Sequence, residues 1–215
     1  MNKALLAAGA VLLALATAPS SARGQLPGMP VWNSPQGGTG LLIAADVGRP
    51  DSVGGRGTTL GGRVALGFGS LTLSGSYGSD KPSGASALKE YGGTAAYRLI
   101  GGTLIPVAVN LQGGLARADD AGSWNTRLTG ALGFAVDLPT PGVHVEPWIA
   151  PGLRALRVGA TSTTNTEFGV AGGLTVRFGL VGVHAALDYQ DVPGGGHTTT
   201  LGVGLHLDIR PSLGL

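Results

Sequence analysis

Seven ionisable residues in the second half of the chain have side chains suited to chemistry, because imidazole and carboxylate groups can bind a metal ion or exchange a proton. They are Asp137, His144, Glu146, Arg177, His184, His206 and Asp208. The same residues can form an inert plug, since charges buried inside a protein must be paired. We expect the plug, with no catalytic, cofactor-binding or metal-ligating residue.

Short catalytic motifs are missing from the sequence. It contains no G-x-x-x-x-G-K-[ST] phosphate loop, no G-x-S-x-G nucleophile turn and no H-E-x-x-H metal motif. The stretch "GFGSLTLSG" at 67–75 is expected to be a tight turn followed by a strand.

The elements that must position these side chains are strands. From Thr39 onward apolar residues recur at every second position, which is the period of a half-buried strand. The pattern predicts ten strands, with eight as the alternative count. Their expected ranges are 39–49, 58–69, 71–79, 88–100, 103–118, 124–138, 143–158, 165–178, 181–191 and 197–210.

The connections between these strands alternate in length. Long polar loops such as "GRPDSVGGRG" alternate with tight turns such as "PTPG" at 139–142. Transmembrane barrels of bacteria combine short periplasmic turns, longer external loops and an even strand count. The sequence therefore predicts an all-β chain that forms a single antiparallel up-and-down transmembrane barrel.

The two faces of the strands differ in a way that favours this fold. One face is nearly free of charge, and the other carries Gly, Ala and a few charged residues. A soluble exported barrel or sandwich, the architectural alternative, would expose a polar face rich in Lys and Glu. Small residues suit a confined interior instead, so we expect the apolar face to contact lipid.

Aromatic residues on the apolar parity fall near the strand ends, as in the girdles that flank a lipid-facing band. Ten residues separate Trp124 from Phe134, which corresponds to about 25 Å of height in a tilted strand. The expected girdle residues are Tyr77, Tyr91, Trp124, Phe168 and Tyr189 near long loops, and Phe68, Phe134 and Phe178 near short turns.

By this pattern, residues 39–210 resemble the small outer-membrane β-barrel proteins of Gram-negative bacteria, the group that includes OmpA-like and OmpW-like barrels. The resemblance implies outer-membrane lipid, lipopolysaccharide and the barrel-insertion machinery as partners. One departure is that the last strand, "TTTLGVGLHLDIR", carries no aromatic residue. Many members of the group end on one.

The implied function is structural, or that of a narrow pore for small solutes, without catalysis. We expect small inward residues at mid-height and larger charged residues near the periplasmic end, which would make a cup open outward. An outer-membrane enzyme with a site at the external rim is an alternative, and a surface adhesin is another. The candidate rim residues are Asp46, Glu90, Glu167, Asp188, Asp191 and His197.

The chain ends and the composition fix the remaining expectations. Residues 1–22 read as a cleavable signal peptide, 23–38 as a Pro- and Gly-rich linker that could enter the lumen, and 211–215 as a tail. The chain has no Cys, and 14 basic residues balance 12 acidic ones, which argues against a nucleic-acid partner.

In strand 143–158 we expect a bulge near Pro151, because apolar residues change parity there.

Overall fold

The computed structural model describes residues 34–53, 56–84, 86–102, 105–120, 123–158, 163–192 and 194–210. Every regular element in this part of the chain is a β-strand. The strands are β1 Gly40–Pro50, β2 Gly57–Phe68, β3 Leu71–Pro82, β4 Leu88–Gly102, β5 Ile105–Asp120, β6 Ser123–Val136, β7 Leu138–Thr140, β8 Val143–Val158, β9 Thr163–Phe178, β10 Val181–Asp191 and β11 His197–Ile209.

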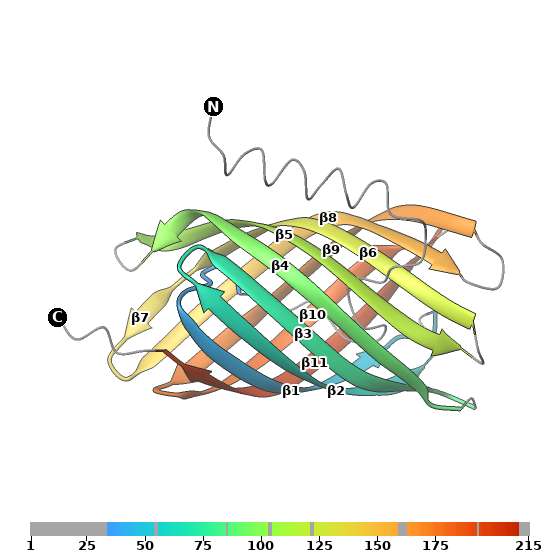
Figure 1. Ribbon diagram of the computed structural model, residues 1–215, viewed down its shortest axis with the longest axis horizontal. Coiled ribbons are helices and arrows are strands. Elements are labelled where there is room, and N and C mark those ends of the chain that lie inside the picture. Colours follow the sequence, from blue (N-terminus) through green and yellow to red (C-terminus); the bar gives the residue numbers. More distant parts are fainter. Residues whose placement is uncertain are drawn as a thin grey trace.

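The strands form one closed antiparallel barrel (Figure 1). Apart from β6 and β7, neighbours in sequence pair with each other, β1 pairs with β11, and β6 pairs with β8. The short β7 follows β6 after Asp137 and pairs with the start of β8, so β6 and β7 together make one wall strand. The prediction of a ten-stranded barrel is confirmed, and closure leaves no unpaired sheet edge.

The two ends of the barrel are defined by their connections. At the short-turn end, two-residue turns join β2 to β3, β7 to β8 and β9 to β10. Gly69, Gly142 and Gly179 in these turns have φ values of 64°, 78° and 61°, which favour glycine. The opposite end, here called the long-loop end, carries connections such as 51–56 and 83–87. β7 marks the short-turn end at the left of Figure 1.

The outer surface of the barrel is apolar. Outward side chains such as Leu60 and Leu205 are 58% and 62% exposed, whereas inward ones such as Glu146 and His206 are 2% and 3% exposed. A soluble barrel has the reverse arrangement, with apolar side chains inside. An apolar exterior over a polar interior is the arrangement of a transmembrane barrel. Among the described residues, no helix is long and apolar enough to cross a membrane.

All eight aromatic residues assigned to girdles are exposed on the outer face. Those toward the long-loop end are Tyr77, Tyr91, Trp124, Phe168 and Tyr189, and those toward the short-turn end are Phe68, Phe134 and Phe178.

The expected bulge near Pro151 is wrong. The register between β8 and β9 runs without a shift from His144–Arg177 to Val158–Thr163. Proline has no backbone N–H to donate, and the ladder between β6 and β8 skips its position without an inserted residue. Consequently Leu156 stays on the inward parity and Arg157 on the outward one. The observed register shifts lie between β4 and β5, from Arg98 to Gly102.

Candidate functional site

The most concentrated group of ionisable side chains lies in the lumen, where β1, β2, β10 and β11 meet. Asp46 contacts His184 with an Oδ1–Nε2 distance of 2.5 Å, and Arg63 Nη2 lies 3.1 Å from Asp46 Oδ2. His184 Nδ1 is in turn 3.2 Å from His206 Nδ1. All four side chains are largely buried, so the charges neutralise each other where water is scarce.

Glycine on the intervening strand lets these side chains meet. Asp46 and His184 lie on β1 and β10, and Gly204 of β11 is paired directly with both. A Cβ on Gly204 would overlap the His184 ring and would lie 2.5 Å from Asp46 Oδ1. Small inward-facing residues therefore leave the space in which charged side chains on alternate strands contact one another.

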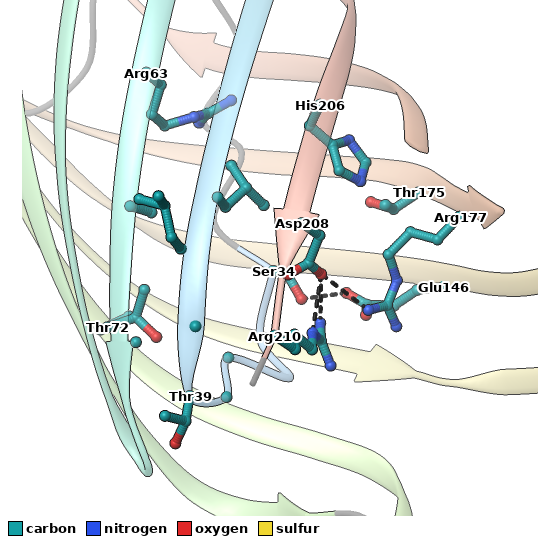
Figure 2. Close-up of a pocket in the computed structure, with 18 residues that line it drawn as sticks. Ser34, Thr39, Arg63, Thr72, Glu146, Thr175, Arg177, His206, Asp208 and Arg210 are labelled. Atoms are coloured by element: carbon teal, nitrogen blue, oxygen red, sulfur yellow. Dashed lines mark hydrogen bonds and ion pairs between the residues drawn. The ribbon is translucent and has the colours of Figure 1, made fainter. Parts of the chain in front are cut away.

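A second cluster lies closer to the short-turn end. Arg177 of β9 and Arg210 both bind Asp208 Oδ2, at 3.0 Å and 2.8 Å. Figure 2 shows these three residues beside Glu146 and Ser34. They line a cavity of about 70 Å³, and His206 lines it as well.

The segment Ser34–Gly38 enters the lumen at this end and closes over the second cluster. Ser34 donates a hydrogen bond to Glu146 at 2.6 Å, and Arg98 donates one to the carbonyl of Gln36 at 2.6 Å. Pro35 is fully buried. The expectation that the linker enters the lumen is confirmed for these residues, while Trp32 and the rest of 1–33 lie outside the described residues.

Trp148 fills the middle of the lumen. Its indole is 5% exposed and packs in a cluster of small residues contributed by five other strand positions. The cluster comprises Ala44, Ala135, Ala150, Ala171 and Ala186. A Cβ on Gly173 would lie 3.0 Å from Trp148 Cζ2, so one large ring fits only because its neighbours are small.

The expectation that large charged residues gather near the short-turn end is wrong. Arg154 and Asp188 form a buried ion pair at 2.5 Å in the half of the barrel nearer the long loops. Glu90, two residues from the start of β4 at that end, is completely buried. The charged residues extend along the lumen because Gly and Ala on neighbouring strands leave space at several heights.

The seven residues predicted as a plug divide into two groups. Glu146, Arg177, His184, His206 and Asp208 lie in the lumen, as the parity of the strands predicts. Asp137 and His144 instead lie beside the β7–β8 turn, 3.6 Å apart, with 49% of the His144 side chain exposed. Sequence reasoning omitted Asp46, Arg63 and Ser34 from the plug. Asp46 and Arg63 carry the right parity, but Ser34 lies in a segment without any periodic pattern.

The candidate rim residues of an enzyme are dispersed. Asp46 is bound to His184 and Asp188 to Arg154, whereas His197 stacks on the exposed ring of Tyr189 at 5.0 Å. Within the described ranges, no three His, Asp or Glu side chains are placed to hold a metal ion. What the lumen groups do chemically is pair with each other.

Comparison with known proteins yields likeness in structure alone. No family model matches the chain, and neither does any curated protein. Solved structures that resemble it include the outer membrane enzyme PagL, at a TM-score of 0.45 and 12% identity over 78% of this chain and 99% of that one. The N-terminal β-barrel domain of Pseudomonas aeruginosa OprF has a TM-score of 0.36 and 20% identity over 80% and 100%. Neisserial surface protein A has a TM-score of 0.37 and 15% identity over 79% and 96%.

Proposed function

We propose that this chain is an integral outer-membrane β-barrel protein with a closed lumen, which serves a structural or small-solute role without catalysis. The observation that carries the proposal is the pairing of an apolar exterior on all sides with a filled, charge-paired interior. In this placement the short-turn end faces the periplasm and the long-loop end faces outward, the usual orientation of such barrels.

The size of the lumen cavities supports a closed barrel. The cavity near the short-turn end measures about 70 Å³, and one beside Gln112 and Arg154 about 20 Å³. One water molecule occupies roughly 30 Å³ of liquid, so the first space holds about two waters and the second no more than one. Between the ends stand Trp148, the Asp46–His184 contact and the Ser34–Gly38 segment.

The membrane placement is tested by fractionation and by electrophoresis in SDS with and without heating. The full chain, expressed in a Gram-negative host, is expected in the outer-membrane fraction and is expected to change mobility on heating. A periplasmic soluble protein with no heat-dependent shift would overturn the membrane placement.

The closed lumen is tested by recording from single molecules in planar lipid bilayers. The unmodified protein is expected to show no steady conductance. A triple variant, Arg98→Ala with Glu146→Ala and Trp148→Ala, removes the side chains that bind Gln36 and Ser34 together with the large ring in the lumen, and it is expected to show intermittent openings. The control variant Arg49→Ala with Lys89→Ala, on the outer face, is expected to stay closed. Steady conductance by the unmodified protein would refute the proposal.

A further inference from the structure

The outer face carries a short row of polar side chains at the long-loop end that the lumen does not explain. Arg117 of β5 lies directly opposite Thr126 of β6, and Thr126 lies directly opposite Arg157 of β8. Directly opposed residues of antiparallel strands have Cβ atoms about 5 Å apart on the same face. Two guanidinium-bearing side chains thus flank one threonine on the outside of the barrel.

Thr126 gives a second, independent indication of a site at this position. The side chain alternates with inward Asn125 and Arg127 and therefore points outward, yet Thr126 has 0% exposure. Its neighbours on the outer face must cover it. The Thr126 hydroxyl makes no hydrogen bond in the described part of the chain. A buried hydroxyl without a partner costs free energy unless a ligand supplies the missing bond.

Aromatic rings border the row at its Arg117 end and on the side of the loops. Tyr91 lies directly opposite Arg117, and Trp124 lies two residues from Thr126 on the same strand. The two rings contact each other edge to face at 5.7 Å. Exposed Tyr and Trp rings concentrate at the level of lipid headgroups. The row is therefore at the height where a headgroup would meet the protein.

Positively charged side chains on the outer face gather near the long-loop end. Arg49, Lys81 and Lys89 are also exposed near the long-loop end and lie opposite outward residues of neighbouring strands. Within the described strands, outward positions near the short turns carry apolar side chains such as Phe68, Leu71 and Phe178. One carboxylate, Asp119, lies beyond Arg117 toward the loops, but Arg157 forms no ion pair among the described residues.

We infer that Arg117, Thr126 and Arg157 form a site for the phosphate group of an anionic lipid in the leaflet at the long-loop end. Guanidinium groups bind phosphate oxygens in a bidentate manner. When the side chains that cover Thr126 turn toward the phosphate, the Thr126 hydroxyl becomes able to donate a further hydrogen bond. The inference rests on the proposed membrane placement, since only a membrane brings lipid headgroups to this height.

The test uses tryptophan fluorescence of the full chain folded in neutral detergent. A background of Trp32→Phe and Trp148→Phe leaves Trp124 as the reporter beside the site. The probes are a phosphorylated glycolipid (lipid A), its dephosphorylated form, and inorganic phosphate. Only the phosphorylated lipid is expected to shift the emission at micromolar concentration.

Four single substitutions locate the effect. Arg117→Gln and Arg157→Gln are each expected to weaken binding of the phosphorylated lipid about tenfold, the loss of one good charged hydrogen bond. Lys81→Gln removes one outward charge at the same end but outside the row, and it is expected to change binding less than about twofold. Arg157→Lys keeps the charge without the planar fork and is expected to give an intermediate affinity.

Three results would overturn the site. Equal losses in Arg157→Gln and Lys81→Gln would show a diffuse charge effect, and equal binding of the dephosphorylated lipid would show that phosphate is not recognised. A matching response to inorganic phosphate would show a free-anion site instead of a lipid site. The heat-dependent gel shift, measured on the same samples, reports separately whether the membrane barrel itself has formed.

Discussion

Gly204 lies on β11 between Asp46 of β1 and His184 of β10, where any side chain would separate them. Gly169 of β9 has the same role for Arg154 and Asp188, because its Cβ would overlap the Arg154 guanidinium. Gly62, by contrast, faces outward, and a Cβ there would lie 3.6 Å from the Ala44 carbonyl oxygen, in ordinary contact. Glycines within the strands thus differ in how much an added methyl group would destabilise the protein.

We predict that Gly204→Ala lowers the free energy of unfolding by about 1–3 kcal/mol, the cost of overpacking a well-packed interior. Gly62→Ala is the matched control and should leave stability unchanged or slightly raised, since alanine loses less backbone entropy than glycine. Urea titration of the barrel in detergent micelles, followed by tryptophan fluorescence, measures both. Equal stability of the two variants would contradict the role assigned to Gly204.

The buried pair of Arg154 and Asp188 gives a second prediction for single residues. Asp188→Leu alone should cost about 3–5 kcal/mol, because it leaves a buried guanidinium without its carboxylate. Arg154→Met together with Asp188→Leu should recover most of that loss, since replacing both charges removes the need to compensate either. The same urea titration tests this, and a double variant as unstable as Asp188→Leu would argue against the pairing as the source of the effect.

At the scale of elements, β8 is the strand whose sequence departs most from regular alternation. Pro147, Pro151 and an inward Trp148 interrupt its alternation, yet its register with β9 is continuous from end to end. Leu156 therefore faces inward and Arg157 outward. This facing places Arg157 beside Thr126 and makes the outer row possible.

The facing of β8 beyond Pro151 can be tested with cysteine pairs, because the chain has no native cysteine. Ala155→Cys with Thr166→Cys places two thiols at directly opposed positions. A short bifunctional thiol reagent should cross-link them. Leu156→Cys with Thr166→Cys is the control and should remain unlinked, since adjacent residues of a strand point to opposite faces. Cross-linking of the control pair alone would restore the bulge.

The elements were predictable where the physical signal is local. Alternation along each strand marks which side chains share a face, so the bounds of β2 and β10 and the facing of Glu146 or His184 follow from neighbouring residues. The position of a residue along the barrel axis is not determined by its neighbours in sequence. Tilted, staggered strands offset one another, so His144 shares the inward parity and still lies at the rim. Segment 34–38 has no period, and only the closed barrel shows what it binds.

At the scale of the whole molecule, the barrel separates two environments with a wall one strand thick. Trp124 and Trp148 are 40% and 5% exposed, on the outer face and in the lumen respectively. The two rings of the same type therefore report the two sides of the wall.

We predict that lipids whose acyl chains are brominated close to the headgroup quench Trp124 more strongly than Trp148. The measurement compares two proteins reconstituted in vesicles, each with one tryptophan. One carries Trp32→Phe with Trp148→Phe, and the other carries Trp32→Phe with Trp124→Phe. Quenching requires near contact with the acyl chains, which the lumen wall prevents for Trp148. Stronger quenching of Trp148 than of Trp124 would mean that the two faces had been assigned the wrong way round.

The joining of β1 to β11 has a consequence for how the molecule is made. Asp51 accepts a hydrogen bond from the amide of Thr199, 148 residues further along the chain, and Ser34 reaches Glu146 across 112 residues. The wall cannot close until the last strand arrives, and β8 must be in place before Ser34 can bind Glu146. A chain whose synthesis stops before β11 would keep one open edge on β1. The wall therefore closes around the Ser34–Gly38 segment only after β11 has been made and has paired with β1.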